Sequence, residues 1–463
     1  MHLRALALCL ALVCPPLLAR EAPAALPVPP SGVIGVEEAM LTPGFWIARQ
    51  QDPDRIILSP AEIAAQNARV LREDPSMHDL RALPATLSKA QVAGWIEALS
   101  QRPQHPLYDV DGKPVPAATL DRLVDALALD AIPPRQPTRY GLVVQRAALR
   151  TFPTDLRVFG SRGDTDIDRF QETAEFPGTP VAIVHASRDG LWLFVLSPRY
   201  AAWVRREFVA TGSAAEVFGY VDRKPYRVIA GASVHTVYTP ERPEVSQLQL
   251  DMGTRVPLGA DWPADRPVNG QTAYAAHVLE LPYRQADGAL AFTPALLQKN
   301  ADSVSDYLPL TPANLIRQAF KFLGERYGWG HAYDGRDCSG FVSDVYRSMG
   351  VDLPRNTSRQ AISPALQHRA FTAADDHAAR MAAVRQLQVG DLVYIPGHVM
   401  MVLGWYQGQP WVIHDTGGIS YRDGGKMRYV KLNAVSVTPL LPLLFERGDS
   451  YVDRMTSIVH IHR

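Results

Sequence analysis

Apolar and polar positions follow a helical period in the N-terminal part of the chain. The Ser-Pro-Ala-Glu run at 59–62 combines an N-cap residue, a proline at the first helical position and a glutamate that can close a capping box. Two further helical patterns cover 89–100 and 117–129, and a proline-rich stretch at 133–137 marks a linker. We therefore predict an N-terminal helical domain over residues 32–134.

Short apolar runs replace the helical pattern in the middle of the chain. The runs at 181–186 and 191–196 are rich in β-branched and aromatic residues, and the Ser-Arg-Asp-Gly segment 187–190 between them is a hairpin signal. Short strands without a long helix are typical of small β-barrels. The stretch is long enough for two such barrels, which we place at 138–212 and 213–300.

In the C-terminal part, helical patterns come first and strand patterns follow. A Thr-Pro pair at 311–312 opens one helix, and residues 339–349 form the next. Strand patterns lie at 391–395, 398–403, 411–414 and 429–432. This order predicts an α+β domain over 306–463, and the whole chain is expected to be a multidomain α+β protein.

Residues 1–24 have the features of an export signal. Arg4 precedes the apolar run 5–13, and prolines and small residues follow it. No other stretch approaches the roughly 18 apolar residues of a membrane-spanning helix. We expect a periplasmic or secreted protein without a stable membrane span, with lipid attachment through Cys14 as the alternative.

Composition and charge exclude several classes of function. The 463 residues include 47 Lys plus Arg and 47 Asp plus Glu, so the formal net charge is zero. Sequence-independent nucleic-acid binding needs a basic surface, so we expect no nucleic-acid partner. No run of five like charges is present, which excludes a charged tail.

Cysteine usage draws attention to one residue. The three cysteines are Cys9, Cys14 and Cys338, and removal of the predicted signal would leave only the last. A single thiol forms neither an internal disulfide nor a cysteine-based metal cluster. Cys338 is therefore either a buried apolar residue or a reactive group.

The surroundings of Cys338 favour reactivity. A glycine-containing loop precedes it, and the predicted helix begins directly after it. Unpaired N–H groups and the helix dipole at such a position favour a thiolate, so we expect a lowered thiol pKa. The same N–H groups can stabilise an oxyanion.

Two histidines are candidates for the base that a cysteine nucleophile needs. His398 begins one predicted strand, His414 ends another, and a turn containing Gly408 joins the two strands. An antiparallel hairpin would bring the rings together, with His398 as base and His414 orienting it. A zinc site is the competing interpretation, but the chain has no His-Glu-x-x-His motif and no second cysteine beside Cys338. We expect no metal and no cofactor.

Five short blocks, in order and spacing, resemble the NlpC/P60 cysteine peptidases. The blocks are Tyr327-Gly328-Trp329-Gly330, Asp337-Cys338-Ser339-Gly340-Phe341-Val342, Leu387-Gln388-Val389-Gly390-Asp391-Leu392-Val393, Gly397-His398-Val399 and Ile413-His414. The upstream part is similar to a subgroup with an N-terminal helical domain and two bacterial SH3-like barrels.

The resemblance implies a papain-like fold and hydrolysis of murein peptides after γ-linked D-glutamate, before a diamino acid, with a free N-terminal L-Ala. It assigns Cys338 as nucleophile, His398 as base and His414 as its orienting partner. The substrate-binding residues that it implies are Tyr327, Asp337, Ser339 and, from the first barrel, Tyr200. We expect a monomer whose partner is peptidoglycan or its peptides.

Several points differ from the family pattern or stay open. Asn356 stands where relatives often have an acid or a small residue, and His331 stands where many have a second glycine. The stretch 361–386 is either a lid or a helical insertion. The barrels either bind wall polymer or close the cleft to all but short peptides. The alternative functions are an amidase or acyl transferase that uses the same site, and a wall-binding scaffold without activity.

Overall fold

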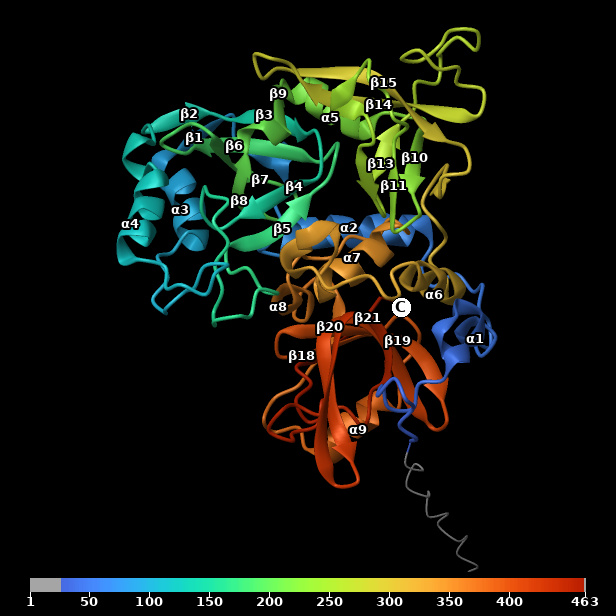
Figure 1. Ribbon diagram of the computed structural model, residues 1–463. Helices are drawn as coiled ribbons and strands as arrows, with labels where there is room; N and C mark the ends of the chain where they lie inside the picture. The colour runs from blue at the N-terminus through green and yellow to red at the C-terminus, as the bar shows by residue number, and fades with distance from the viewer. Residues whose placement is uncertain (1–25, 462–463) are drawn as a thin grey trace, which may run out of the picture.

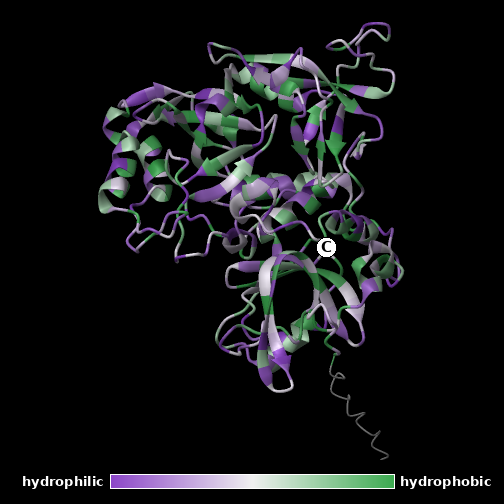
Figure 2. Ribbon diagram, in the orientation of Figure 1, coloured by the Kyte–Doolittle hydropathy of each residue, from purple (hydrophilic) through white to green (hydrophobic). Residues whose placement is uncertain are grey.

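A computed structural model describes residues 26–461. Two β-rich units lie side by side above the C-terminal α+β unit (Figure 1). Helices α2 (Pro60–Glu73) and α7 (Cys338–Arg347) lie between these β-rich units and the C-terminal sheet. Hydrophilic residues gather on loops and on the tip of the long C-terminal hairpin, whereas apolar residues line the strands (Figure 2). No helix within residues 26–461 is long and apolar enough to cross a membrane.

The N-terminal helices are close to those predicted, but they do not share one core. They are η1 (Glu38–Leu41), α1 (Pro43–Ile47), α2, η2 (Leu80–Ala82), α3 (Lys89–Leu99), α4 (Ala117–Ala126) and η3 (Leu129–Ala131). The capping box of Ser59 and Glu62 opens α2 as predicted. Trp46 and Val70 pack in the core of the C-terminal unit, whereas Ile96 packs under the first β unit. Helices contiguous in sequence therefore support two different parts of the molecule.

The first β unit is a seven-stranded antiparallel sheet in the order β5-β4-β8-β7-β6-β3-β9. Its strands are β3 (Arg139–Val143), β4 (Ala147–Arg150), β5 (Gln171–Glu175), β6 (Pro180–Ala186), β7 (Trp192–Leu196), β8 (Ala201–Arg205) and β9 (Val209–Gly212), with η4 (Arg206–Phe208) before β9. A separate pair, β1 (Thr86–Ser88) and β2 (Arg135–Pro137), flanks α3. The predicted turn at 187–190 joins β6 to β7.

The second β unit opens with α5 (Ala214–Asp222), a helix that the strand pattern does not predict. Its capping box of Ser213 and Glu216 is the sequence signal for it. The strands that follow are β10 (Tyr226–Ile229), β11 (Ser233–His235), β12 (Gln249–Asp251), β13 (Arg255–Pro257), β14 (Ala276–Arg284), β15 (Leu290–Gln298) and β16 (Ser303–Val304), with η5 (Pro243–Val245). Residues from separate strand pairs, among them Leu250 and Leu279, fill one core.

The C-terminal unit is built on a six-stranded sheet in the order β17-β22-β18-β19-β20-β21. Its elements are α6 (Pro312–Phe320), η6 (Trp329–Asp334), α7, α8 (Thr357–Gln360), β17 (Gln367–Ala370), α9 (His377–Val384), β18 (Leu392–Ile395), β19 (His398–Tyr406), β20 (Gln409–Asp423), β21 (Lys426–Pro439) and β22 (Ser457–His460). Because side chains alternate along a strand, Val399 and Met401 pack with α7, whereas Met400 and Val402 pack with α9.

One expectation about this unit needs correction, and one alternative left open by the sequence is decided. Strands β20 and β21, which form the long hairpin, extend well beyond the ends predicted for them. His414 therefore lies in the interior of β20 rather than at its end. The stretch 361–386 contains the edge strand β17, paired to β22, and the packed helix α9. The strand and the helix in this stretch are therefore part of the folded C-terminal unit and do not form a lid.

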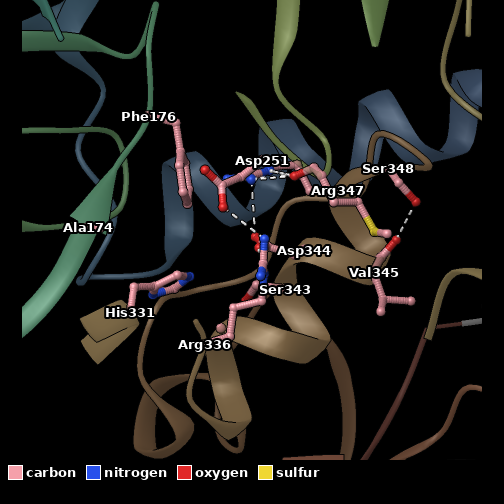
Figure 3. A network of polar contacts seen from close by, with 12 residues as sticks. Ala174, Phe176, Asp251, His331, Arg336, Ser343, Asp344, Val345, Arg347 and Ser348 are labelled. Carbon is pink, nitrogen blue, oxygen red and sulfur yellow. Dashed lines mark hydrogen bonds and ion pairs between the residues drawn. The ribbon is translucent and has the colours of Figure 1, made fainter. Parts of the chain in front are cut away.

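Buried ion pairs connect the three units. Arg336, just before α7, pairs with Asp251 of the second β unit at 2.8 Å and with Asp344 of α7 at 2.7 Å. Arg146 of the first β unit approaches the same Asp251 at 3.5 Å. Figure 3 shows Asp251 and Asp344 gathered around Arg336. The loop that leads into α7 is thus fixed from both β units.

Candidate active site

Cys338 is the first residue of α7, as the sequence predicts. Asp337 is the N-cap residue, and its Oδ1 accepts the Gly340 N–H at 2.8 Å. The Cys338 side chain is buried, and the Val399 backbone N–H donates a hydrogen bond to its sulfur. The thiol therefore lies between the start of a helix and the start of β19, where its backbone partner Val399 directly follows His398 in the chain.

The two histidines meet in the predicted antiparallel hairpin. Strands β19 and β20 pair antiparallel, and His398 Nε2 lies 2.7 Å from His414 Nδ1. His414 Nε2 lies 3.0 Å from Thr438 Oγ1 on β21. Since Nε2 of His398 is engaged, its Nδ1 is the nitrogen left for the thiol. Thr438 is a third member that sequence reasoning missed, because only the pairing of β20 with β21 brings it to His414.

Burial, rather than the helix dipole, dominates the protonation of this pair. Burial raises the pKa of the Cys338 thiol, and the nearby Asp337 carboxylate raises it further. Burial also lowers the pKa of His398 to about 4 and that of His414 well below its usual value. The expectation of a lowered thiol pKa is therefore wrong for the free protein, in which the neutral thiol and neutral imidazole are favoured.

Tyr327 faces the same site from the loop before η6. Burial raises the pKa of its hydroxyl, and the adjacent Cys338 and Asp337 raise it further. The hydroxyl therefore stays protonated and can donate a hydrogen bond near the sulfur.

The predicted amine ligands Asp337 and Ser339 already have partners. Arg355, which is buried, donates to Asp337 Oδ2 at 2.8 Å and to Ser339 Oγ at 2.9 Å. The Asp337 carboxylate also accepts two backbone N–H bonds, from Gly330 at 3.0 Å and from Gly340. Arg355 offsets the Asp337 charge, and the pKa of the carboxyl falls below its usual value despite burial.

Tyr200 lies beside a carboxylate that the sequence did not single out. Its hydroxyl donates to Glu172 Oε2 at 2.5 Å, and Thr151 donates to Glu172 Oε1 at 2.5 Å. The side chain of Asn356 also hydrogen bonds the Tyr200 hydroxyl. Glu172 lies on β5 in an ordinary polar run, so only the packing of the first β unit on the C-terminal unit identifies it.

His331 takes the place of the expected glycine without losing the loop conformation. Its φ is 62°, in the left-handed region, and Arg355 Nη2 donates to its Nδ1 at 2.9 Å. The buried ring packs against Gly340, where a Cβ would come within 2.5 Å of His331 Cε1. The departure from the family pattern thus adds a contact between η6 and α7.

A cleft of about 660 Å³ opens beside His398. Tyr327 and Thr416 line it from the C-terminal unit, and the loop 163–167 of the first β unit closes its far side. Within residues 26–461, no group of three or more His, Cys, Asp or Glu side chains is arranged to hold a metal ion.

Comparisons with known proteins agree with the sequence blocks. Residues 324–436 match the NlpC/P60 family model, and residues 157–205 match an SH3 domain of the SH3b1 type. No curated protein matches the chain.

Solved structures include an NlpC/P60 endopeptidase from Photobacterium damselae subsp. piscicida, which is 16% identical over 89% of this chain and 94% of that chain, with a TM-score of 0.69. The peptidoglycan hydrolase RipB from Mycobacterium tuberculosis is 22% identical over 33% of this chain and 65% of that chain, with a TM-score of 0.21. NlpC2 from Trichomonas vaginalis is 12% identical over 66% and 98%, with a TM-score of 0.23. The first of these has the same fold. The predicted family resemblance is confirmed, and the chain combines an SH3 domain of the SH3b1 type with an NlpC/P60 domain in a multidomain α+β fold.

Proposed function

We propose that this protein is a cysteine peptidase that hydrolyses murein peptides between γ-linked D-glutamate and the diamino acid that follows. The observation that carries the proposal is the contact between the rings of His398 and His414, with the backbone N–H of Val399, the residue after His398, bonded to the Cys338 sulfur, within an NlpC/P60 domain. We further propose that it acts on wall peptides outside the cytoplasm. The export signal proposed for residues 1–24 lies outside the described residues.

In the first step the Cys338 sulfur attacks the γ-carbonyl of D-glutamate. Because the neutral pair is favoured at rest, His398 Nδ1 takes the thiol proton as the C–S bond forms. This direction of transfer needs the proton of neutral His398 on Nε2, donated to His414 Nδ1. The unpaired N–H groups at the start of α7, together with the Tyr327 hydroxyl, face the resulting oxyanion.

In the second step the tetrahedral intermediate collapses and the C–N bond breaks. His398 gives its proton to the departing amine of the diamino acid, and an acyl-enzyme remains on Cys338. Water, deprotonated by His398, then attacks the thioester and releases the L-Ala-γ-D-Glu product. His414 and Thr438 hold the His398 ring throughout, because their contacts fix its far nitrogen.

We propose Glu172, rather than Asp337 alone, as the carboxylate that recognises a free N-terminal amine. Arg355 offsets the charge of Asp337. Glu172 instead accepts hydrogen bonds from the hydroxyls of Tyr200 and Thr151, which are neutral groups and do not offset a carboxylate charge. An ammonium beside a carboxylate makes a charge-assisted bond about twice as strong as a neutral one.

The decisive experiment is product analysis on defined peptides. The full chain is incubated with L-Ala-γ-D-Glu-meso-diaminopimelate, with its N-terminal amine free or acetylated, and the products are identified by mass. We expect release of free diaminopimelate from the free-amine peptide, much slower cleavage of the acetylated one, and no product from Cys338→Ala. Cleavage at the muramyl–L-Ala bond of a muropeptide would instead support an amidase, and transfer to an added amine an acyl transferase.

Glu172→Gln tests the amine assignment with the same two peptides. We expect kcat/KM for the free-amine peptide to fall about tenfold or more, and that for the acetylated peptide to change little. Equal losses on both peptides would exclude Glu172 as the amine ligand.

A further inference from the structure

Strand β20 carries a buried acid that the reaction steps above do not use. Asp415 directly follows His414 and is fully buried, and neither oxygen of its carboxyl has a hydrogen-bond partner within residues 26–461. Resting on the proposed function, we propose that Asp415 serves the site as an uncharged carboxylic acid, which must keep its proton while Cys338 is acylated. Loss of that proton switches the site off.

The side chain of Asp415 faces the helix that carries Cys338. Because side chains alternate along a strand, Asp415 shares a face of the sheet with Ile413. Across the strand pair it lies opposite Val435 of β21. Ile413 and Val435 belong to the apolar core that also contains Cys338 and Phe341 of α7. The carboxyl is therefore enclosed on the side of the sheet that packs against α7.

The surroundings of Asp415 offer no free positive charge to balance a carboxylate. Arg336 is the one cation in the described part of the chain whose charge lowers the pKa of Asp415. Its guanidinium is already paired with three carboxylates, those of Asp251, Glu325 and Asp344. A buried carboxylate without its own cation or hydrogen-bond donor is strongly disfavoured, so the neutral acid is the stable form.

Most of the titratable groups around Asp415 are acids. Those that act on it, or on which its charge acts, come from two loops and from α7; they are Glu325, Tyr327, Arg336, Asp337 and Cys338. Burial raises the pKa of Asp415 well above its usual value, and Asp337 and Glu325 raise it further. On its own strand, burial keeps the neighbouring His414 neutral. The charges of the folded protein thus agree with the geometry in favouring the acid form.

A negative charge at Asp415 would oppose the first step of the reaction. Beyond burial and the Asp337 carboxylate, which act most strongly, such a charge raises the pKa of the Cys338 thiol. As the sulfur attacks, negative charge also develops on the carbonyl oxygen, and a carboxylate would repel it in a buried site where screening is weak. The protonated acid carries no net charge. Asp415 gives up no proton during turnover, because the thiol proton goes to His398.

The first test follows the thiol and needs no substrate. The full chain is labelled with iodoacetamide over a range of pH, and the label on the peptide that contains Cys338 is measured by mass. Asp415→Asn and Asp415→Ala cannot ionise at this position, so both should label at lower pH than the native protein. Each pH unit of displacement corresponds to about tenfold faster labelling while the thiol is mostly neutral.

The second test follows the proton through unfolding in urea at several pH values. An acid that is protonated in the folded chain but ionised in the unfolded chain destabilises the folded state as pH rises above about 4. Relative to either variant, the unfolding constant of the native protein should therefore rise about tenfold per pH unit from about pH 5, until Asp415 ionises in the folded protein. Packing changes in the variants do not depend on pH and do not alter this slope.

The third test is kcat/KM for the free-amine peptide. The ratio of Asp415→Asn to native kcat/KM should rise with pH, whereas a purely structural role would give the same ratio at every pH. Asp423→Asn is the matched control, because it alters an exposed aspartate of the same strand. It should follow the native profile in all three tests.

Three results would each overturn the inference. They are an unchanged labelling profile in both Asp415 variants, a ratio of unfolding constants that does not vary with pH, and an activity ratio that is equal at every pH. Hydrolysis of no peptide by the native protein would instead overturn the proposed function. The labelling and unfolding profiles would still decide whether Asp415 holds a proton beside Cys338.

Discussion

The surroundings of Cys338 and His398 lead each of them to favour its neutral form. Because one pKa moves up and the other moves down, a preformed thiolate–imidazolium pair is disfavoured in the free protein. Activation then depends on transfer of the thiol proton to His398 while the sulfur attacks the substrate carbonyl. The fixed contact of His398 with His414 provides the orientation that this step requires.

The pH dependence should report the lowered pKa of His398. Its imidazole must be neutral to act as a base, and burial lowers its pKa to about 4. As pH falls through about 4, the ring becomes protonated and kcat/KM should fall tenfold per pH unit. We expect the acid limb of a stopped-flow or mass-based profile near that value. A limb near 6.5 would show that the ring titrates as if it were exposed.

His414 should affect kcat rather than KM. It is fully buried and contacts His398, not the cleft. His414→Ala leaves His398 Nε2 without its acceptor, so kcat should fall about 10² or more while KM changes little. His414→Gln, which keeps an acceptor, should recover part of the loss. A rise in KM alone would mean that His414 acts on substrate binding.

At the scale of elements, α7 and the β19–β20 hairpin set the geometry of the site. The helix presents Cys338 at its N-terminus, and the antiparallel register places His398 and His414 on one face. A one-residue slip would move one ring to the opposite face of the sheet. Successive apolar side chains of the strands pack alternately into the cores on the two faces of the sheet, and this packing holds the register.

The packing of η6 on α7 can be tested at Gly340. A Cβ there would lie 2.5 Å from His331 Cε1, so Gly340→Ala must displace the loop before Cys338. We expect a loss of about 1–3 kcal/mol in the free energy of unfolding, and reduced activity.

Gly94→Ala is the matched control. It also substitutes a helical glycine, in α3, but no atom beyond its chain neighbours and its own helix backbone lies within 4 Å of the added Cβ. It should stabilise the protein by about 0.5–1 kcal/mol. Urea titration measures both, and an unchanged or stabilised Gly340→Ala would contradict the tight contact.

At the scale of the whole molecule, buried charges hold the three units in a fixed arrangement around the site. Arg336 interacts with Asp251, Asp344 and Glu325, which come from two of the units. Arg355 adds a link to the first β unit through Thr173 Oγ1 at 2.6 Å. The SH3 domain therefore shapes the cleft as well as lying beside it.

Removal of one member of this network should be costly. Arg336→Met leaves the carboxylates of Asp251 and Asp344 buried without their main partner, so unfolding should become easier by about 3–5 kcal/mol. Arg428→Gln breaks the exposed pair with Asp423 and should cost less than about 1 kcal/mol. Denaturant titration measures the free energy of unfolding of both variants. Similar losses in the two would show that the Arg336 network does not stabilise the contact between the units.

Local patterns were enough to place much of the fold. Capping residues marked the start of α2, and the turn at 187–190 marked the β6–β7 hairpin. The patterns failed where stability comes from distant packing. The outer half of β21 is mostly exposed, and the outer half of β20 combines exposed residues with the buried run 419–421, so neither shows the regular alternation of a half-buried strand. Helix α5 interrupts a region that otherwise contains strands and two short 3-10 helices.

The sequence by itself determined the helix start at Cys338, the hairpin that joins His398 to His414, and the family blocks around them, because these depend on residues close together along the chain. Only the tertiary structure decided the partners of Asp337, the approach of Glu172 and Tyr200 to the site, and the raised pKa of the Cys338 thiol. Those properties depend on burial and on charges from other units. Neither can be read from the neighbours of a residue in the sequence.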